Sequence, residues 1–351
     1  MPFIHATATA TPDYKLSLDD VVQFGSDWLV DKPKLLALFE RFVRSSHTMS
    51  RSFVLSYEEL LTPPSFAKRA EMFESIAPNL GATALRDALA RSEIEPSELS
   101  TLIFTSCSCP TIPAVDAVVI EEMRLSSSVS RIPIFQHGCA GGVVGLSLAN
   151  KLAKTEGAVA LLSVELCSLV FQPQLPSPAE LIGAALFADG AASCIVSPVY
   201  RKGSIEFKDS RSFLIPHSRH LMGYDIFDDG FHLRLSRELP LILSSTAPEQ
   251  VRVFLGENNL SEKDVAYWLF HPGGIKILDF LEASLDVSRS QCRWSREVLS
   301  EVGNLSSATV IFVLDRFLHS RECKPGDRVV MMGIGPGLTL ELILFQMPEE
   351  Q

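Results

Sequence analysis

Residues 131–152 carry the pattern that most constrains how this chain can fold. A short apolar run at residues 132–135 leads into the small-residue segment Gly138-Cys139-Ala140-Gly141-Gly142, and apolar and small residues then recur at helical spacing as far as Leu152. Apolar residues at spacings of three and four are typical of a helix, whereas a short apolar run bounded by turn residues is typical of a buried strand. The pattern therefore predicts a strand, a tight turn and a helix, with Cys139 in the turn.

The predicted position of Cys139 gives its thiol a chemical advantage. Unpaired backbone N–H groups and the positive end of the helix dipole at a helix N-terminus both favour the thiolate form of a cysteine. Neighbouring glycines let a substrate carbonyl approach closely and let backbone N–H groups face a developing oxyanion. Cys139 is therefore a candidate nucleophile, although a buried structural cysteine at a packed turn would give the same local pattern.

The composition predicts a large α/β protein and argues against several other classes. The chain has 351 residues, of which 46% are hydrophobic, so a sheet covered on both faces is expected. No apolar run approaches the roughly 20 residues that span a bilayer, and the N-terminus lacks the basic and apolar regions of a signal peptide, so we expect no transmembrane segment and a cytoplasmic location.

The net charge and the cysteines argue against nucleic acid, a disulfide framework and structural zinc. The net charge of −11 disfavours nucleic acid as a partner. The seven cysteines show no CxxC pair and no Cys/His ligand spacing, which argues against a disulfide framework and a structural zinc site.

The order of predicted helices and strands suggests two similar halves, residues 1–200 and 201–351. A small-residue turn that feeds a helix occurs once in each half, at Gly138-Cys139 and at Gly303-Asn304. A duplicated α/β unit with paired sheets fits this order better than a single Rossmann sheet does. The expected helices are 67–92, 114–125, 240–255, 275–285 and 303–318, and the expected strands are 101–107, 158–166, 191–199, 204–208, 266–270, 328–334 and 338–346.

Three polar residues stand at predicted strand or helix ends and could converge. These are Cys139, His271 after the strand 266–270, and Asn304 before the helix 303–318. Open α/β folds place their sites at such ends. A cysteine nucleophile needs a nearby imidazole, and acyl transfer needs hydrogen-bond donors for the thioester oxygen. Taken singly, His271 could be an ordinary loop residue and Asn304 an ordinary helix N-cap.

Four segments in order resemble the type III polyketide synthases, the chalcone synthase-like family. They are the segment around Cys139, then Trp-Leu-Phe-His-Pro-Gly-Gly at 268–274, Glu-Val-Gly-Asn-Leu-Ser-Ser-Ala at 301–308 and Gly-Ile-Gly-Pro-Gly-Leu-Thr at 333–339. The resemblance covers nearly the whole chain. It implies a five-layered αβαβα thiolase-like fold, a homodimer, coenzyme A thioesters as substrates and no metal or redox cofactor.

The same resemblance implies roles for individual residues. Cys139 would accept the acyl group, His271 would be its ion-pair partner and an oxyanion donor, and Asn304 would be the second donor and would assist malonyl decarboxylation. Phe187 and Phe231 would be the aromatic residues that separate the CoA tunnel from the reaction cavity, although ordinary core packing would also account for both. Ile112 stands where the family often presents a Met across the dimer interface.

The residues at cavity positions bear on which starter substrate the enzyme uses. Plant enzymes of the family have Thr or Ser at several positions where this chain has Cys107, Cys167 and Val170, and the surrounding segments look closest to bacterial alkylpyrone and alkylresorcinol synthases. We therefore expect malonyl-CoA to be condensed onto an acyl-CoA starter, a fatty acyl group by preference, because a buried chain gains about 0.8 kcal/mol per CH₂. A malonyl-primed synthase that makes tetrahydroxynaphthalene or a phloroglucinol is the alternative within the family.

Further expectations concern CoA and two rival functions. Arg51 is the first candidate for a CoA phosphate contact, ahead of Arg44 and Lys68, although a solvated basic face would explain them equally well. Gly273 and Gly274 are expected to line the pantetheine tunnel. The rivals are a ketoacyl synthase that uses acyl carrier protein and a non-catalytic acyl-CoA-binding protein of the same fold.

Overall fold

The computed structural model describes residues 1–349, and its main feature is a nine-stranded sheet within them. The strand order is β11-β12-β13-β8-β1-β7-β6-β4-β5. The strands of this sheet are β1 (Phe3–Ala10), β4 (Leu99–Thr105), β5 (Ser130–Ile134), β6 (Ala158–Leu166), β7 (Asp189–Ser197), β8 (Ile205–Leu214), β11 (Tyr267–Phe270), β12 (Arg328–Gly335) and β13 (Thr339–Gln346).

One half of the sheet comes from the N-terminal part of the sequence and the other from the C-terminal part, and the two halves are joined by a short pairing of β1 with β8. β1, β4, β5, β6 and β7 form one half, and β8, β11, β12 and β13 form the other. β1 and β8 pair through only Phe3 with Glu206 and Ile4 with Ile205. The paired sheets that we predicted are thus one continuous sheet. The predicted division at residue 200 falls between the end of β7 and the start of β8 and stays a prediction.

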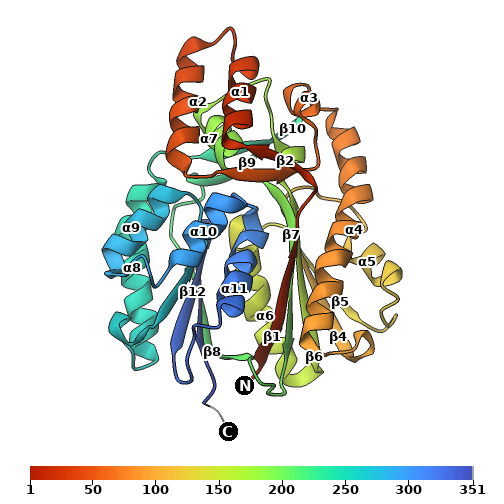
Figure 1. Ribbon diagram of the computed structural model, residues 1–351, viewed down its shortest axis with the longest axis vertical. Coiled ribbons are helices and arrows are strands. Elements are labelled where there is room, and N and C mark those ends of the chain that lie inside the picture. The colour runs from red at the N-terminus through yellow and green to blue at the C-terminus, as the bar shows by residue number, and fades with distance from the viewer. Residues whose placement is uncertain (350–351) are drawn as a thin grey trace.

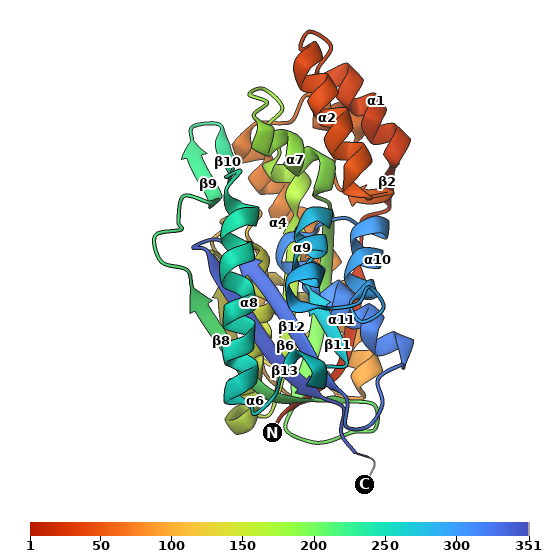
Figure 2. The same cartoon turned by 90° about the vertical axis from the view of Figure 1, so that its left-hand side faces the viewer.

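Helices cover both faces of the sheet, and together with the two halves of the sheet they form five layers (Figures 1 and 2). α6 (Gly141–Glu156) and α11 (Thr309–Ser320) lie between the two halves of the sheet and share one hydrophobic core with both. α4 (Phe66–Ser92) and α5 (Asp116–Glu122) cover the outer face of the first half. α8 (Leu239–Glu257) and α9 (Ile275–Leu285) cover the outer face of the second half. This is the predicted αβαβα arrangement.

The alternation of side chains explains why the central strands are apolar throughout. On β6, Ala160, Leu162 and Val164 pack in the core beneath α4, whereas Val159 and Leu161 pack against the central helices. All residues of β6 and β7 are buried, as expected for strands covered on both faces.

A further group of elements lies at one end of the layers, at the top of Figure 1. Here α1, α2 and α7 gather above the sheet together with the hairpin of β9 and β10, and α10 lies below them at the level of α9 (Figures 1 and 2). The bounds are α1 (Leu18–Trp28), α2 (Pro33–Ser46), α3 (Tyr57–Leu61), α7 (Pro178–Leu186), α10 (Arg293–Glu301), β2 (Tyr14–Ser17), β3 (Ser50–Phe53), β9 (Met222–Phe227) and β10 (Gly230–Leu235). Sequence patterns did not predict these elements.

Candidate active site

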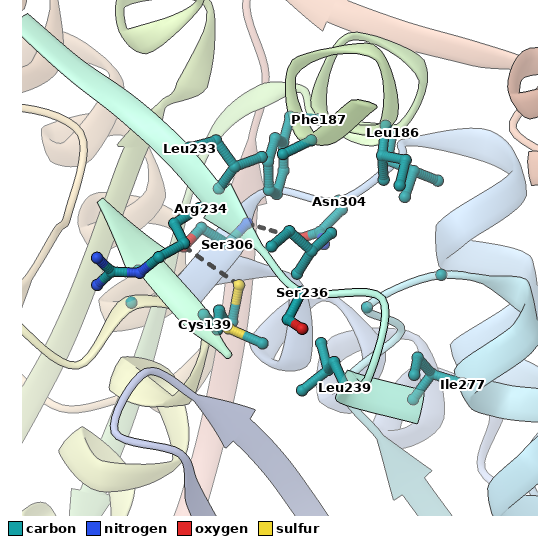
Figure 3. Close-up of a pocket in the computed structure, with 18 of the residues that line it drawn as sticks. Cys139, Leu186, Phe187, Leu233, Arg234, Ser236, Leu239, Ile277, Asn304 and Ser306 are labelled. Atoms are coloured by element: carbon teal, nitrogen blue, oxygen red, sulfur yellow. Dashed lines mark hydrogen bonds between the residues drawn. The ribbon is translucent and has the colours of Figure 1, made fainter. Parts of the chain in front are cut away.

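Cys139, His271 and Asn304 line one cavity of about 1050 Å³. Cys139 lies in the short 3₁₀ turn Gly138–Ala140 that leads into α6. His271 follows β11, and Asn304 lies between α10 and α11. The structure thus brings together the three residues that the sequence placed at strand and helix ends, and Figure 3 shows Cys139 and Asn304 facing the same space.

The glycines around Cys139 are needed because other parts of the chain approach them closely. A Cβ atom on Gly141 would lie 2.5 Å from the hydroxyl oxygen of Thr105, and one on Gly142 would lie 2.3 Å from the carbonyl oxygen of Ser307. Gly138 has a φ of +50°, a conformation that favours glycine. The small-residue turn therefore lets the N-terminus of α6 pack against the segment that follows Asn304.

The Cys139 thiol has one hydroxyl neighbour and an environment that disfavours its charge. Its Sγ donates to Oγ of Ser306 over 3.6 Å. The side chain is partly open to the cavity, but the surrounding protein raises the pKa of the thiol to about 11, with burial as the main cause. Because burial penalises the thiolate, Cys139 needs a proton acceptor close by in order to react at neutral pH.

His271 is suited to be that acceptor. Its side chain is 3% exposed, and neither Nδ1 nor Nε2 has a hydrogen-bond partner among residues 1–349. Burial lowers the pKa of the imidazole to about 4, so the ring is neutral at pH 7. Because burial disfavours a lone imidazolium, the ring can take up the thiol proton only where the thiolate that forms beside it pairs with the new charge. A buried polar group without a partner is costly, and this one lines the cavity where a substrate would supply the missing contact.

The Asn304 amide is held in one orientation. Its Oδ1 accepts from the backbone N–H of Ser306 at 2.9 Å and from the hydroxyl of Thr309 at 3.2 Å. Its backbone is tied to the end of α7, because its N–H donates to the carbonyl of Leu186 at 2.9 Å. Asn304 therefore caps the following turn as the local pattern suggested, and the same contacts point the NH₂ side of the amide away from that turn as a donor.

Glu165 is a buried residue near the site that sequence reasoning missed. Its carboxylate accepts from the backbone N–H of Cys107 at 3.0 Å, from the hydroxyl of Ser108 at 2.5 Å and from the hydroxyl of Ser307. Burial raises its pKa. The signal was a single acidic residue within the apolar strand 158–166. Glu165 links the end of β4 to the turn after Asn304.

Of the other predicted site residues, five line the same cavity as the three polar residues. These are Cys107, Phe187, Phe231, Gly273 and Gly274. Phe231 stacks on Tyr224 of the neighbouring strand with ring centroids 5.6 Å apart. The sulfur of Cys107 lies 3.1 Å from Oγ of Ser306, the hydroxyl that also contacts Cys139.

Cys167 and Val170 lie elsewhere, in the wall of a second cavity of about 60 Å³. We call this the side cavity and the larger one the main cavity. Phe187, Tyr224 and Leu233 line both cavities and so form the wall between them.

Arg51 does not have the surroundings that we expected of a CoA phosphate contact. Its side chain is 3% exposed and donates from Nη1 to the carbonyl oxygens of Ala184 at 2.5 Å and Phe187 at 3.3 Å. Burial lowers the pKa of its guanidinium to about 9. Arg51 holds the end of α7 that carries Phe187, and this geometry does not support the expected phosphate contact.

Other cations line the main cavity instead. Arg41, Arg237 and Lys276 are exposed residues of its lining, on α2, before α8 and on α9. The sequence placed Arg41 in a basic segment with Arg44 and Arg51, but it did not group Arg41 with Arg237 and Lys276, because scattered basic residues on separate elements form no motif.

Two family models match this chain and together cover most of it. Residues 3–198 match the N-terminal domain of the chalcone and stilbene synthases, and residues 206–348 match the C-terminal domain. The chain belongs to the chalcone and stilbene synthase family. It is a type III polyketide synthase, an enzyme of the acyltransferase class that uses CoA thioesters without a metal or redox cofactor.

Individual relatives and one solved structure agree with this assignment. The chain is 31% identical over 335 residues to a phloroglucinol synthase from Pseudomonas fluorescens, which covers 94% of this chain and 95% of that protein. It is 30% identical to a putative chalcone synthase from Bacillus subtilis, with 98% of each chain covered. The crystal structure of 1,3,6,8-tetrahydroxynaphthalene synthase from Streptomyces coelicolor A3(2), a bacterial type III polyketide synthase, superimposes with a TM-score of 0.94 at 28% identity and covers 99% of this chain and 100% of that one. The ketoacyl synthase and non-catalytic alternatives gain no support.

Residues 1–349 contain neither a cluster of metal ligands nor a membrane-spanning helix. No group of His, Cys, Asp and Glu within them could hold a metal ion. Among the same residues, no helix is long and apolar enough to cross a membrane.

Proposed function

We propose that this polyketide synthase is primed by malonyl-CoA and that Cys139, His271 and Asn304 carry its chemistry. His271 accepts the thiol proton of Cys139 as the sulfur attacks the thioester carbonyl, and CoA leaves as its thiol. The developing oxyanion needs donors, which His271 and the Asn304 amide supply. The convergence of these three side chains on the main cavity supports these roles.

The chain is then extended by decarboxylation. Malonyl-CoA loses CO₂, and the electron pair of the broken C–C bond passes to the thioester, so that an enolate forms beside His271 and Asn304. The enolate carbon attacks the Cys139 thioester and the sulfur leaves as thiolate. Phe187 and Phe231 contribute apolar walls near this step. Excluding water there favours condensation over hydrolysis.

The small volume of the side cavity is the observation that favours a malonyl starter. Cys167 and Val170, which we expected to open a tunnel for a fatty acyl chain, line a space of about 60 Å³. A cavity that holds one benzene ring measures about 150 Å³. The side cavity is therefore too small for a long chain, and relatives named for phloroglucinol and tetrahydroxynaphthalene agree with an aromatic product.

A fatty acyl starter that leads to an alkylpyrone or alkylresorcinol is the second candidate. It is favoured by an apolar stretch of the main cavity that is lined by Leu186, Leu235, Leu239, Leu243 and Ile277. Each CH₂ placed there would gain about 0.8 kcal/mol.

Three cations could bind the phosphates of CoA. Arg41, Arg237 and Lys276 line the main cavity, are exposed and make no ion pair with any of the described residues. Phosphate groups favour such arrangements of Arg and Lys. We assign the phosphates to these residues in place of Arg51.

The enzyme is also proposed to be a homodimer. Ile112, the residue expected at the interface, is 95% exposed, and a large apolar side chain with that exposure gains from being covered. Light scattering of the wild type and of Ile112→Asp would test this. A monomer mass for the wild type would contradict the homodimer, and a dimer mass that persists in Ile112→Asp would contradict the place of Ile112 in the interface.

The deciding experiment is mass spectrometry of the products. The purified enzyme is given malonyl-CoA alone and then with acyl-CoAs of increasing length, with Cys139→Ala as the blank. An aromatic polyphenol from malonyl-CoA alone would support the proposal. Products that appear only with a fatty starter would replace it with the second candidate, and full condensation activity of Cys139→Ala would overturn both.

A further inference from the structure

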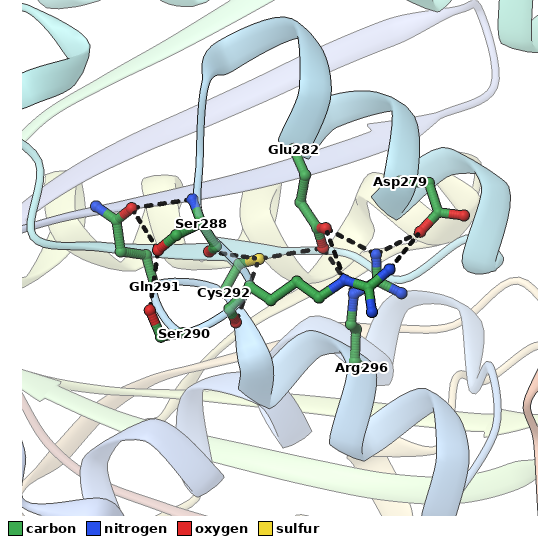
Figure 4. Close-up of polar contacts among 8 residues, drawn as sticks. Asp279, Glu282, Ser288, Ser290, Gln291, Cys292 and Arg296 are labelled. Carbon is green, nitrogen blue, oxygen red and sulfur yellow. Dashed lines mark hydrogen bonds and ion pairs between the residues drawn. The ribbon is translucent and has the colours of Figure 1, made fainter.

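A compact polar cluster joins α9 to α10 (Figure 4). Arg296 of α10 donates from Nε to Oε1 of Glu282 at 2.7 Å and from Nη2 to Oε2 of the same carboxylate at 2.8 Å. Nη2 also donates to Oδ1 of Asp279 at 2.5 Å. We call Asp279, Glu282 and Arg296 the α9–α10 clamp, since both carboxylates are on α9.

The burial of the clamp makes it stronger than a surface ion pair. The side chains of Glu282 and Arg296 are 9% and 18% exposed. The thiol of Cys292 donates to Oε1 of Glu282 at 3.3 Å from the interior side. Two parallel charge-assisted hydrogen bonds fix a guanidinium and a carboxylate in one plane. The more exposed Arg289 also lies 4.0 Å from Asp279 and 3.8 Å from Glu282, so it offsets part of the carboxylate charge, but it precedes α10 and does not join that helix to α9. The clamp therefore sets the spacing between the two helices.

The two helices are also the elements that adjoin His271 and Asn304. Pro272, Gly273 and Gly274 lead from His271 into α9, and Gly274 accepts the first hydrogen bonds of that helix. At the other end, α10 ends at Glu301, and Asn304 follows closely. A shift of α9 against α10 would change how these two residues are placed relative to each other.

The imidazole of His271 lies beside Gly273, in the segment that leads into α9. A Cβ atom on Gly273 would lie 3.8 Å from Cδ2 and 4.0 Å from Nε2 of the imidazole. Neither ring nitrogen has a hydrogen-bond partner in the described part of the chain, so the ring is held by packing, whereas its backbone N–H donates to the carbonyl of Met332 on β12 at 2.8 Å. A shift of α9 would move Gly273 and so change the packing of the ring.

We propose that Arg296 is a positioning residue, which holds α9 against α10 so that His271 and Asn304 address the same thioester oxygen. The inference rests on the roles proposed above for His271 and Asn304. A misplacement of about 1 Å can cost about a hundredfold in rate, so a helix shift that is too small to unfold the protein would be visible in the kinetics.

Arg293 offers a matched control on the same helix. It pairs with Glu322 beyond α11 and with Glu297 of its own helix, and it lies over the ring of Trp294 with its Cζ 4.1 Å from the centroid. Within residues 1–349, no hydrogen bond or ion pair joins it to α9. Arg293→Gln removes a charged pair from α10 as Arg296→Gln does, but it leaves the clamp intact.

The experiment compares malonyl-CoA decarboxylation in the wild type, Arg296→Gln, Arg296→Lys and Arg293→Gln. We expect Arg296→Gln to lower kcat about tenfold or more with KM changed by no more than about twofold. Arg296→Lys should recover part of the loss, because it keeps the charge but not the fork. Arg293→Gln should retain the wild-type kcat. A kcat for Arg296→Gln within about twofold of the wild type, or an equal loss in Arg293→Gln, would overturn the proposal.

A double mutant separates positioning from general destabilisation. If Arg296 acts by placing Asn304 relative to His271, Arg296→Gln should cost little more in an Asn304→Ala background, since residues that act together are not additive. A full further loss in that background would contradict the proposal. If Arg296→Gln does not fold, Asp279→Asn can be used in its place, because it removes only the exposed part of the clamp. We expect this variant to lose kcat in the same way as Arg296→Gln, but by a smaller factor. Wild-type decarboxylation in both His271→Ala and Asn304→Ala would instead refute the proposed catalytic roles.

Discussion

The main cavity and the side cavity are separated by one wall but are built in different ways. The main cavity, about 1050 Å³, is lined by residues of both halves of the chain, with Cys139 from the first and His271 and Asn304 from the second. The side cavity, about 60 Å³, is lined mainly by residues of the first half, among them Cys167 and Val170. Phe187, Tyr224 and Leu233 line both.

From this difference we expect the main cavity to control the reaction rate and the side cavity to control the size of the starter. The proposed reactive groups lie where turns of the two halves meet, so their positions depend on how the halves pack. The side cavity lies within the wall of one half, where a change of side chain alters volume without touching a reacting atom. Substitutions in the two cavities should therefore have different effects on rate and on starter preference.

The largest expected effect is in the main cavity and concerns the thiol proton. Burial raises the pKa of the Cys139 thiol to about 11 with His271 in place, so at neutral pH the thiolate forms only where a neighbouring group takes up the proton. His271→Ala should therefore lower the rate of Cys139 alkylation by iodoacetamide at pH 7 by about a hundredfold or more. Because a raised thiol pKa means less thiolate at neutral pH, the rate in this variant should climb steadily as the pH rises toward 11. Alkylation is followed by mass spectrometry from pH 6 to 10.

Asn304→Ala is the control for this prediction. It removes a hydrogen-bond donor from the same cavity but no proton acceptor, so alkylation at pH 7 should stay close to the wild-type rate. An unchanged rate in His271→Ala would show that the two side chains do not exchange a proton.

A smaller effect is expected at the shared wall. Tyr224→Ala should join the two cavities and let acyl-CoA starters with a few more carbons be used, with a gain of about 0.8 kcal/mol per additional buried CH₂. The measurement is kcat/KM for a series of acyl-CoAs. Phe227→Ala, on the same strand but 60% exposed, should show no such gain. Equal starter profiles for wild type and Tyr224→Ala would mean that the wall does not limit the starter.

The smallest effect is expected inside the side cavity. Val170→Phe should fill it and cost about 1–3 kcal/mol of stability through overpacking, as measured by denaturant unfolding. Because no reacting atom lies there, the products from malonyl-CoA alone should not change. A changed product ratio would show that the side cavity receives the growing chain.

Local patterns were enough for the repeated elements of the fold. The apolar run 158–166 coincides with β6, and the amphipathic pattern 67–92 with α4, since burial imposes a period on the residues themselves. Where an element is short or packs by one face only, as in the β9–β10 hairpin and α10, the pattern was too weak, and these elements include residues of the cavity wall and the clamp.

The sequence by itself determined the α/β class with two similar halves and the three polar residues at strand and helix ends, because local turns and helix starts depend on the types and spacing of neighbouring residues. The αβαβα layering and the family followed from the resemblance of four segments to the type III polyketide synthases. Only the tertiary structure decided that Arg51 is buried against α7, that Cys167 and Val170 lie behind a wall, that Glu165 binds the end of β4, and that Arg296 pairs with Glu282 of α9. These facts depend on contacts between residues far apart in sequence, which no local pattern records.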